Sequence, residues 1–167
     1  MKFRILVPAL VLACIATGAL AHGYKLGSLV IGHPWSRATP KGATVATGYM
    51  TLTNNGTTPD RLIAGSSEAA PKFEIHEMSM DGGVMKMREL KDGLEIAPGA
   101  TVELKPGSYH VMLVGLTHPL AKGDRLKGSL TFEKAGKIDV EFVVEDIGGT
   151  PKSGGMPMDH DDKMHMH

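Results

Sequence analysis

Cysteine is almost absent from this sequence, since Cys14 is the only one among 167 residues. It lies inside an N-terminal export signal, so we expect the mature chain to contain no thiol and no disulfide. This absence excludes a cysteine nucleophile, a cysteine-based zinc site and a thiol redox centre. It also excludes a blue-copper centre, because that chemistry requires a cysteine thiolate.

Net charge and aromatic side chains are also scarce. Lysine plus arginine and aspartate plus glutamate each number 18, so nothing indicates binding to nucleic acid or to an anionic membrane surface. Aromatic residues make up only 5% of the chain, whereas methionine occurs 11 times. Methionine is a flexible core filler, but its thioether also binds soft metals, so the positions of the methionines must decide between these uses.

The first residues have the features of an export signal. Lys2 and Arg4 precede an apolar run over residues 5–15, and residues 19–21 read Ala-Leu-Ala, which is an A-x-A cleavage site. The apolar run is too short to be a convincing transmembrane helix. We therefore expect cleavage after Ala21, a periplasmic location and no stable membrane insertion afterwards.

Lipoprotein processing at Cys14 is the alternative fate of this N-terminus. Residues 11–14 read Val-Leu-Ala-Cys, and the bulky Leu12 makes this a poor lipobox. We accordingly divide the chain into a signal peptide over residues 1–21, a folded domain over residues 22–146 and a tail over residues 147–167.

Short β-rich segments separated by turn residues make up the folded domain. Asn-Gly, Asp-Gly and Pro-Gly pairs recur about every ten residues, and no long helical periodicity is present. This pattern predicts an all-β sandwich or barrel. The expected strands are residues 26–31, 43–53, 61–64, 72–80, 84–90, 101–104, 109–116, 124–133 and 137–145.

Two His-x-Met pairs, His76/Met78 and His110/Met112, lie on expected strands. Residues two apart on a strand share a face, so the members of each pair project together. A hairpin turn at residues 81–83 folds the next strand, with its own methionines, back against the first pair. One contact between this hairpin and the strand of the second pair would gather four candidate ligands: His76, Met87, His110 and Met112.

Two imidazoles and two thioethers form a neutral set of soft and intermediate donors that suits Cu(I). Zn(II) usually requires thiolate or carboxylate charge as well, and Cu(II) prefers tetragonal nitrogen and oxygen ligands. Thioethers hold copper less firmly than thiolates do, which favours a protein that transports the metal over one that catalyses a reaction with it.

The remaining histidines and methionines of the domain have simpler interpretations. His33 and His118 each precede a proline, and we interpret both as loop histidines. Four further methionines are interpreted as core or surface side chains, in keeping with the packing habits of this residue: Met50, Met78, Met80 and Met85.

The tail beyond residue 146 contains glycine, proline, serine and charged residues without apolar periodicity, which predicts disorder. It is also rich in histidine and methionine, a composition typical of metal binding. Two interpretations of the tail remain open. It captures a second copper ion, as Cu(II), or it is a solvated terminus with incidental metal affinity. The candidate ligands of the tail are Met156, Met158, His160, Met164, His165, Met166 and His167.

Several stretches of the sequence together resemble the periplasmic copper chaperones known as the PCuAC family. They are HPWSRAT, GYMTLTNNG, PDRLI, FEIHEMSMDGGVMKMREL, LKPGSYHVML and LTFEKAG, and the similarity covers residues 24–145. The family motif is a histidine, ten residues, a methionine, about 21 or 22 residues and then His-x-Met. Here it falls on His76, Met87, His110 and Met112, with ten and 22 intervening residues.

The resemblance implies a cupredoxin-like Greek-key β-sandwich or barrel that binds Cu(I). It further implies delivery of copper toward the CuA centre of cytochrome c oxidase and cooperation with Sco-type thiol proteins. Some members carry a His/Met-rich C-terminal extension linked to Cu(II) capture, and this chain has such an extension.

Two other functions are consistent with the same residues. The protein could buffer periplasmic copper without a dedicated acceptor, and the sequence does not separate this function from delivery. Alternatively, His22 would become N-terminal after cleavage and could chelate Cu(II) as in copper oxygenases, although we interpret it as simply the residue after the signal. Because no Ser/His/Asp arrangement, phosphate-binding glycine loop or pair of catalytic carboxylates stands out, we expect no enzyme activity.

Overall fold

The computed structural model describes residues 23–148. Every regular element in this part of the chain is a β-strand, which confirms the predicted all-β class. The strands are β1 (Gly23–Leu26), β2 (Leu29–Arg37), β3 (Val45–Asn54), β4 (Asp60–Ser67), β5 (Lys72–Asp81), β6 (Val84–Glu89), β7 (Leu94–Ile96), β8 (Thr101–Leu104), β9 (His110–Val114), β10 (Arg125–Phe132) and β11 (Gly136–Glu145).

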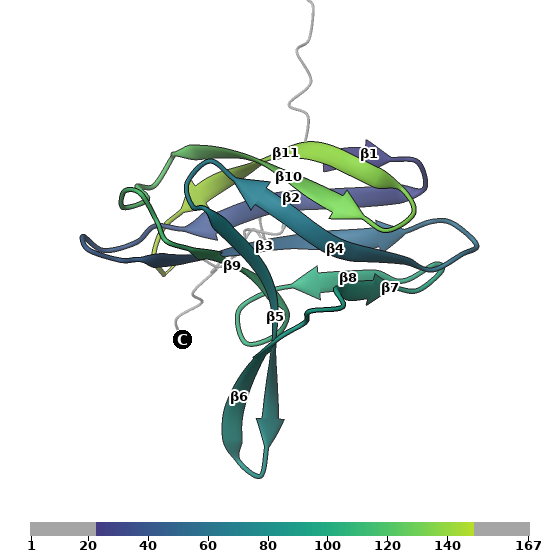
Figure 1. Cartoon of the computed structure of the whole chain (residues 1–167), viewed down its shortest axis with the longest axis horizontal. Coiled ribbons are helices and arrows are strands. Elements are labelled where there is room, and N and C mark those ends of the chain that lie inside the picture. The colour runs from purple at the N-terminus through teal and green to yellow at the C-terminus, as the bar shows by residue number, and fades with distance from the viewer. Residues whose placement is uncertain (1–22, 149–167) are drawn as a thin grey trace, which may run out of the picture.

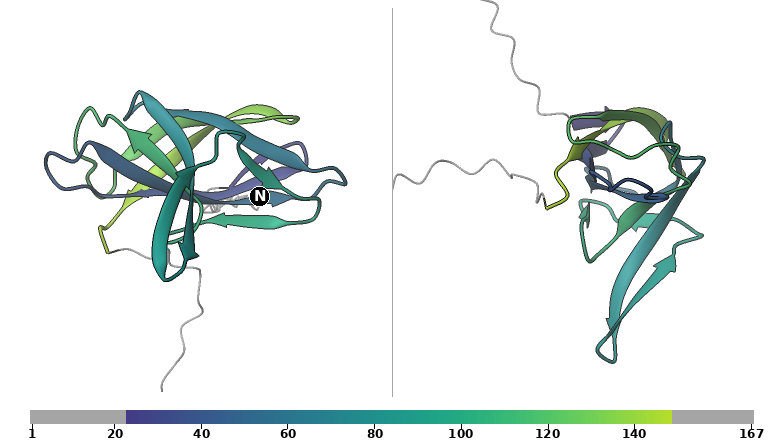
Figure 2. Two further views of the ribbon diagram at one scale, coloured as in Figure 1. Left: turned by 60° about the horizontal axis from the view of Figure 1, so that its bottom comes forward. Right: turned by 90° about the vertical axis from the view of Figure 1, so that its left-hand side faces the viewer.

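The strands form one continuous hydrogen-bonded path in the order β6-β5-β9-β3-β2-β11-β10-β4-β7. β1 pairs with β2 and β8 pairs with β3 beside this path. All these pairings are antiparallel except the one between β11 and β2, which aligns Val143 with Trp35. Figure 1 shows the strands of the body running along the long axis of the molecule, and the path curls over so that its inner face surrounds the core (Figure 2).

Alternating side chains of the body strands fill the core. Phe132 of β10 and Phe142 of β11 are buried, as are Leu52 of β3 and Val111 and Leu113 of β9. β9 therefore packs one face against the core while His110 and Met112, which alternate with these residues, project from the other face. This alternation orients the second His-x-Met pair.

The hairpin of β5 and β6 leaves the body and points away from it, as Figure 1 and the right panel of Figure 2 show. At its base the ring of Phe73 covers Gly65 of β4, so closely that a Cβ atom on Gly65 would lie 2.5–2.7 Å from ring carbons. A glycine at this position lets the aromatic ring approach the β4 backbone. The contact anchors β5 to β4, although these two strands are not hydrogen-bonded neighbours.

Most of the predicted strands are present, with three differences. Residues 26–31 do not form one strand, because a turn with Gly27 at φ +59° separates β1 from β2. The short strand β7 was not predicted, since its three residues are too few to show a period. His33 was predicted to lie in a loop, which is wrong: it lies within β2, at an irregularity where its φ is +45°.

The other predictions concern segments at or beyond the ends of the described chain. The signal sequence, its cleavage after Ala21, Cys14, His22 and the tail ligands between Met156 and His167 lie outside residues 23–148. Among the residues that are described, no helix has the length and apolarity needed to cross a membrane.

Candidate metal centre

A two-residue turn sets the register of the hairpin. Asp81 pairs with Val84, and the intervening Gly82 and Gly83 have φ values of +58° and +79°. Positive φ at both central positions is the requirement of a type I′ turn, which glycine meets without steric cost. With this register, Met78 of β5 lies opposite Met87 of β6.

The pairing of β5 with β9 joins the two His-x-Met segments. His76 lies directly opposite His110, and Glu74 lies directly opposite Met112. Because directly paired residues and residues two apart share a face, the side chains of His76, Met87, His110 and Met112 all emerge on one face of the β6-β5-β9 sheet. The structure thus places on one sheet face the four residues that the spacing had singled out.

The two imidazoles are close enough to share one metal ion. Their ring centroids are 5.7 Å apart with an interplanar angle of 38°. With a metal–nitrogen bond of about 2.0–2.1 Å, a metal ion lies about 3 Å from the centre of each ring, so two ligating rings lie at most about 6 Å apart.

His110 presents a free nitrogen in its neutral form. It is 4% exposed, and its Nδ1 lies 3.1 Å from the carbonyl oxygen of Ser108, to which Nδ1–H donates. Burial lowers the pKa of His110, and the neighbouring His76 lowers it further, against the effect of the Ser108 carbonyl. At neutral pH the ring is therefore neutral, with the lone pair of Nε2 available to a metal ion.

His76 has a nitrogen that no residue within 23–148 satisfies. Its Nε2 donates to Oε2 of Glu74 at 3.0 Å, while its Nδ1 is buried without a hydrogen-bond partner. An unsatisfied buried acceptor destabilises a fold by about 1–3 kcal/mol. A metal ion bound to Nδ1 would remove this cost, and the carboxylate on the other nitrogen is the arrangement that commonly orients metal-binding histidines.

Glu74 and Ser108 are site residues that the sequence analysis did not name. Each positions one imidazole, through a carboxylate for His76 and through a backbone carbonyl for His110. Glu74 had a detectable signal, since it lies two residues before His76 and therefore shares its strand face. The Ser108 carbonyl had none, because backbone contacts are not encoded by residue type.

The four candidate ligands differ in exposure, and Met87 is the most accessible of them. Met87 is 53% exposed and Met112 is half-buried. Within residues 23–148, no three His, Cys, Asp or Glu side chains gather in a way that could hold a metal ion. On the sheet face that carries His76 and His110, Met87 and Met112 present thioethers, and that of Met87 is open to solvent.

The other histidines and methionines lie elsewhere. Met50 is 2% exposed and belongs to the core, as predicted. His118 lies in the loop between β9 and β10, also as predicted, and its Nδ1 is 3.0 Å from Thr117 Oγ1. His33 pairs with Glu145 at 3.0 Å on the surface. Met78 is half-buried, whereas Met80 and Met85 are exposed.

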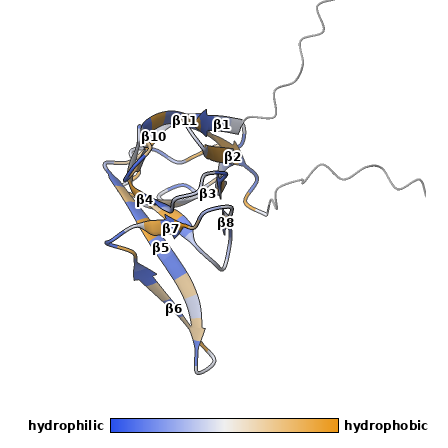
Figure 3. Cartoon of the chain, turned by 90° about the vertical axis from the view of Figure 1, so that its right-hand side faces the viewer, coloured by the Kyte–Doolittle hydropathy of each residue, from blue (hydrophilic) through white to orange (hydrophobic). Residues whose placement is uncertain are grey.

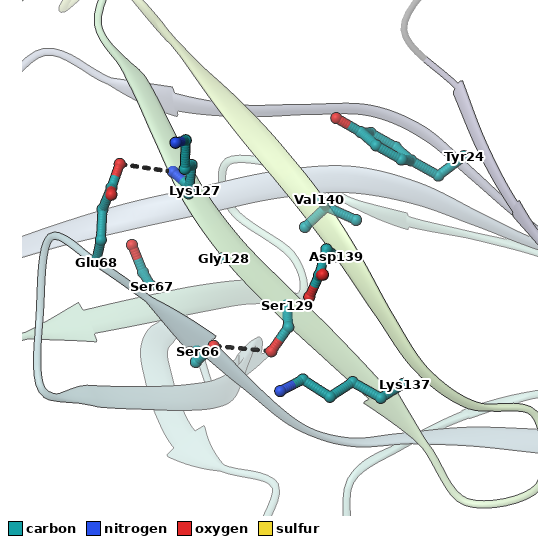
Figure 4. A pocket seen from close by; sticks show the side chains of 10 residues that line it. All are labelled: Tyr24, Ser66, Ser67, Glu68, Lys127, Gly128, Ser129, Lys137, Asp139 and Val140. Carbon is teal, nitrogen blue, oxygen red and sulfur yellow. Dashed lines mark hydrogen bonds between the residues drawn. The ribbon is translucent and has the colours of Figure 1, made fainter.

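A surface hollow of about 620 Å³ lies on a different part of the molecule. β1, β4, β10 and β11 line it, and Figure 4 shows at its wall a hydrogen bond between Ser66 and Ser129 and another from the Lys127 amide to Glu68. Its lining contains neither histidine nor methionine. It has no donor set for a soft metal and is separate from the candidate centre.

Comparison with known proteins identifies a family and two relatives. A family model described as "Putative lipoprotein LpqE-like" matches residues 29–144. The protein "Putative lipoprotein Lxx21020" of Leifsonia xyli subsp. xyli is 30% identical over 135 residues, which span 81% of this chain and 80% of that protein. "Uncharacterized protein RP573" of Rickettsia prowazekii is 33% identical over 85 residues, or 51% of this chain and 47% of that protein.

Solved structures give the same result for the fold. The copper-bound PCuAC domain of PmoF2 is 32% identical, with a TM-score of 0.64 over 75% of this chain and 98% of that domain. The Cu(I) form of DR1885 from Deinococcus radiodurans is 27% identical, with a TM-score of 0.55 over 78% and 85% of the two chains. The resemblance noted from the sequence motifs is thereby confirmed, and the chain belongs to the LpqE-like family, with the cupredoxin-like all-β fold of PCuAC domains.

Proposed function

We propose that this protein is an exported copper chaperone that binds Cu(I) through His76, Met87, His110 and Met112. The observation that carries the proposal is the pair of imidazoles 5.7 Å apart, on the sheet face that also presents both thioethers. Relatives of the same fold have been solved as "copper-bound" and "CuI" forms, which supports copper as the cargo.

The donor set favours the monovalent ion. Four neutral ligands, two of them thioethers, suit Cu(I), whereas Cu(II) prefers a tetragonal set of nitrogen and oxygen ligands. Nδ1 of His76 and Nε2 of His110 would supply the nitrogen donors, because Glu74 and Ser108 occupy the other nitrogen of each ring. The exposed thioether of Met87 permits ligand exchange with an acceptor, so the geometry favours transfer of copper over catalysis with it.

Copper titration of the double variant His110→Ala/Met112→Ala tests the site. We expect Cu(I) affinity to fall by several orders of magnitude in competition with a chelator, while the circular dichroism spectrum stays that of a β protein. His118→Ala is the matched control, because it removes an imidazole in the adjoining loop, off the sheet face that carries the candidate ligands. Unchanged Cu(I) affinity in the double variant would show that the ligands are wrongly assigned.

Delivery toward the CuA centre of cytochrome c oxidase, with a Sco-type partner, is the proposed destination of the copper, and it follows from the family resemblance. Periplasmic buffering without an acceptor is the alternative. Mixing the Cu(I)-loaded protein with an apo CuA domain distinguishes the two functions. A chaperone transfers its copper to the CuA domain within minutes. A buffer keeps its copper even when the CuA domain binds Cu(I) with the same affinity.

The C-terminal tail is proposed to capture a second copper ion as Cu(II). Its donors would come from seven residues: Met156, Met158, His160, Met164, His165, Met166 and His167. Truncation after Asp146 should remove one equivalent of bound copper and spare the Cu(I) site. The same copper stoichiometry in the full-length and truncated chains would refute a role for the tail.

Export is supported by the family, whose model and whose relative in Leifsonia xyli are both described as putative lipoproteins. We propose a periplasmic domain over residues 22–146, released by cleavage after Ala21. The lipoprotein descriptions keep processing at Cys14 as the alternative. Intact mass spectrometry of the exported protein separates them, since lipidation at Cys14 retains residues 14–21 and adds acyl chains.

A further inference from the structure

The β5–β6 hairpin continues the soft-ligand face beyond the candidate copper site. Met78 lies opposite Met87, and Met80 lies opposite Met85, next to the turn. These four side chains share the face on which His76 emerges. The hairpin thus presents two successive cross-strand pairs of thioethers, which follow each other from the imidazoles toward the turn.

Packing does not account for these methionines. Met80 is 66% exposed and Met85 is 52% exposed, and all six residues of β6 are exposed. Figure 3 shows bands of opposite hydropathy along this hairpin, which extends away from the body. An apolar side chain stabilises a fold when it is buried away from water, and the side chains of Met80 and Met85 remain exposed. The core role considered for Met80 and Met85 is therefore excluded.

The opposite face of the same hairpin is polar. Arg88 pairs with Glu77 at 2.7 Å, and Lys86 pairs with Asp81. The hairpin thus separates its residues by chemistry, with charged pairs on one side and thioethers on the other. A strand pair that served only to connect the body to the turn would not require sulfur at four neighbouring positions of one face.

The spacing of the thioethers fits a soft metal ion. Directly paired residues of antiparallel strands have Cβ atoms about 4.5–5.5 Å apart. Metal–sulfur bonds of about 2.3 Å place two sulfur ligands of one ion at most about 4.6 Å apart. The flexible methionine side chain adjusts to this separation, so a third thioether from the neighbouring pair can complete the coordination.

We propose that Met78, Met80 and Met85 form an outer Cu(I) site made of thioethers alone, with Met87 shared between it and the inner site. This inference rests on the proposed function of the inner site. Copper enters at Met80 and Met85 and moves to His76 and His110, about 13 Å along β5 at 3.3 Å per residue. Copper–sulfur bonds break as copper–nitrogen bonds form on neutral imidazoles, so the ion stays monovalent and no proton is transferred.

NMR of the full mature chain, labelled with ¹³C at the methionine ε-methyl groups and at the histidine imidazole rings and titrated anaerobically with Cu(I), tests the outer site. We expect the first equivalent to shift the His76 and His110 imidazole signals together with Met87 and Met112. Further Cu(I) should shift Met78, Met80 and Met85, each resolved from the methyl groups of the tail. Met80 and Met85 signals that stay unchanged to saturation would overturn the inference.

The same titration separates this failure from failure of the proposed function. If the imidazole signals shift while Met80 and Met85 do not, the inner site stands and only the outer site is wrong. If the imidazoles do not shift either, the proposed function itself is wrong.

Loading kinetics test the route. The variant Met80→Leu/Met85→Leu keeps apolar side chains of similar size but lacks sulfur, and both positions are exposed, so it should fold. We expect equal affinity at the inner site but Cu(I) loading slower by about tenfold, because a tethered first site raises the local concentration of metal at the second.

Ser79→Ala/Lys86→Ala is the matched control, since these residues form the cross-strand pair on the polar face. It should load at the wild-type rate. Wild-type loading of Met80→Leu/Met85→Leu would instead refute the route, because copper would then reach His76 and His110 without passing the thioethers at the hairpin tip.

Discussion

The body of the sandwich and the β5–β6 hairpin use the same antiparallel pairing but differ in what their side chains contact. In β10 and β11, alternate residues such as Leu130, Phe132 and Phe142 are buried. In β6 all six residues are exposed. Residue choice in the body is therefore explained by packing, while residue choice in the hairpin is not. The difference teaches that packing explains Met50 in the core but does not explain the exposed methionines of the hairpin.

The two regions meet at the candidate copper site. His110 is buried on β9 beside the core, and Met87 is exposed on β6, beyond it. The candidate site thus combines a buried imidazole of the body with an exposed thioether of the hairpin. Such a site can hold a metal ion in a defined place and still release it through the exposed ligand.

The largest effect on stability is expected from Phe142→Ala, which removes a core side chain of the body. This ring is fully buried, so its removal should lower the free energy of unfolding by about 3–5 kcal/mol. Urea denaturation followed by tryptophan fluorescence at Trp35 measures it. Met85→Ala, the counterpart in the hairpin, should change stability by less than about 0.5 kcal/mol, as exposed positions do. Equal losses in the two variants would contradict the comparison.

Gly65→Ala changes the contact with Phe73 that joins the hairpin to the body. The new methyl group would lie 2.5–2.7 Å from carbons of the Phe73 ring, so the ring must move and β5 with it. We expect destabilisation of about 1–3 kcal/mol together with weaker Cu(I) binding, because His76 follows on the same strand. Gly148→Ala is the control, since its Cβ would contact nothing within 4 Å. Unchanged stability in Gly65→Ala would show that this contact does not anchor the hairpin.

Glu74→Gln changes the orienting group of His76 and leaves the fold intact. Loss of such a partner typically weakens metal binding by about 10–100-fold, which we expect here for Cu(I). Glu77→Gln is the matched control, because this residue lies on the opposite face of β5, where it pairs with Arg88. Competition with a Cu(I) chelator measures both variants, and equal affinities would remove Glu74 from the site.

The smallest effect concerns pH. Burial lowers the pKa of His110 below its ordinary value of about 6.5, so in the metal-free protein the unfolded chain binds the proton more readily than the folded one. The neutral form of His110 therefore contributes to the free energy of unfolding. This contribution is fully present above a pH of about 6.5 and is lost as the pH falls toward the lowered pKa of His110. Denaturation of metal-free His110→Gln should lack this part of the pH dependence, and an identical pH profile in the two proteins would contradict it.

Much of this molecule followed from the sequence because its signals are local. Turn pairs such as Asp81-Gly82 and the alternation of residues along strands are set by backbone sterics and by the two-residue period, which any stretch of chain displays. The same period is sufficient to place His110 and Met112 on one face of their strand. The short strand β7 and the irregularity at His33 were not predicted. Three residues show no period, and a bulge depends on the neighbouring strand.

Tertiary structure decided everything that depends on which strands are neighbours. The order β6-β5-β9 places His76 opposite His110, although the two residues are distant in the chain, and no local pattern specifies that pairing. Burial likewise distinguished Met50 from Met80 and Met85, although all three are methionines on strands. The amino-acid sequence by itself determined which donors are available and on which faces they lie. Their convergence arises only when the core forms, because burial of alternate side chains in the body selects the strand order that brings β5 beside β9.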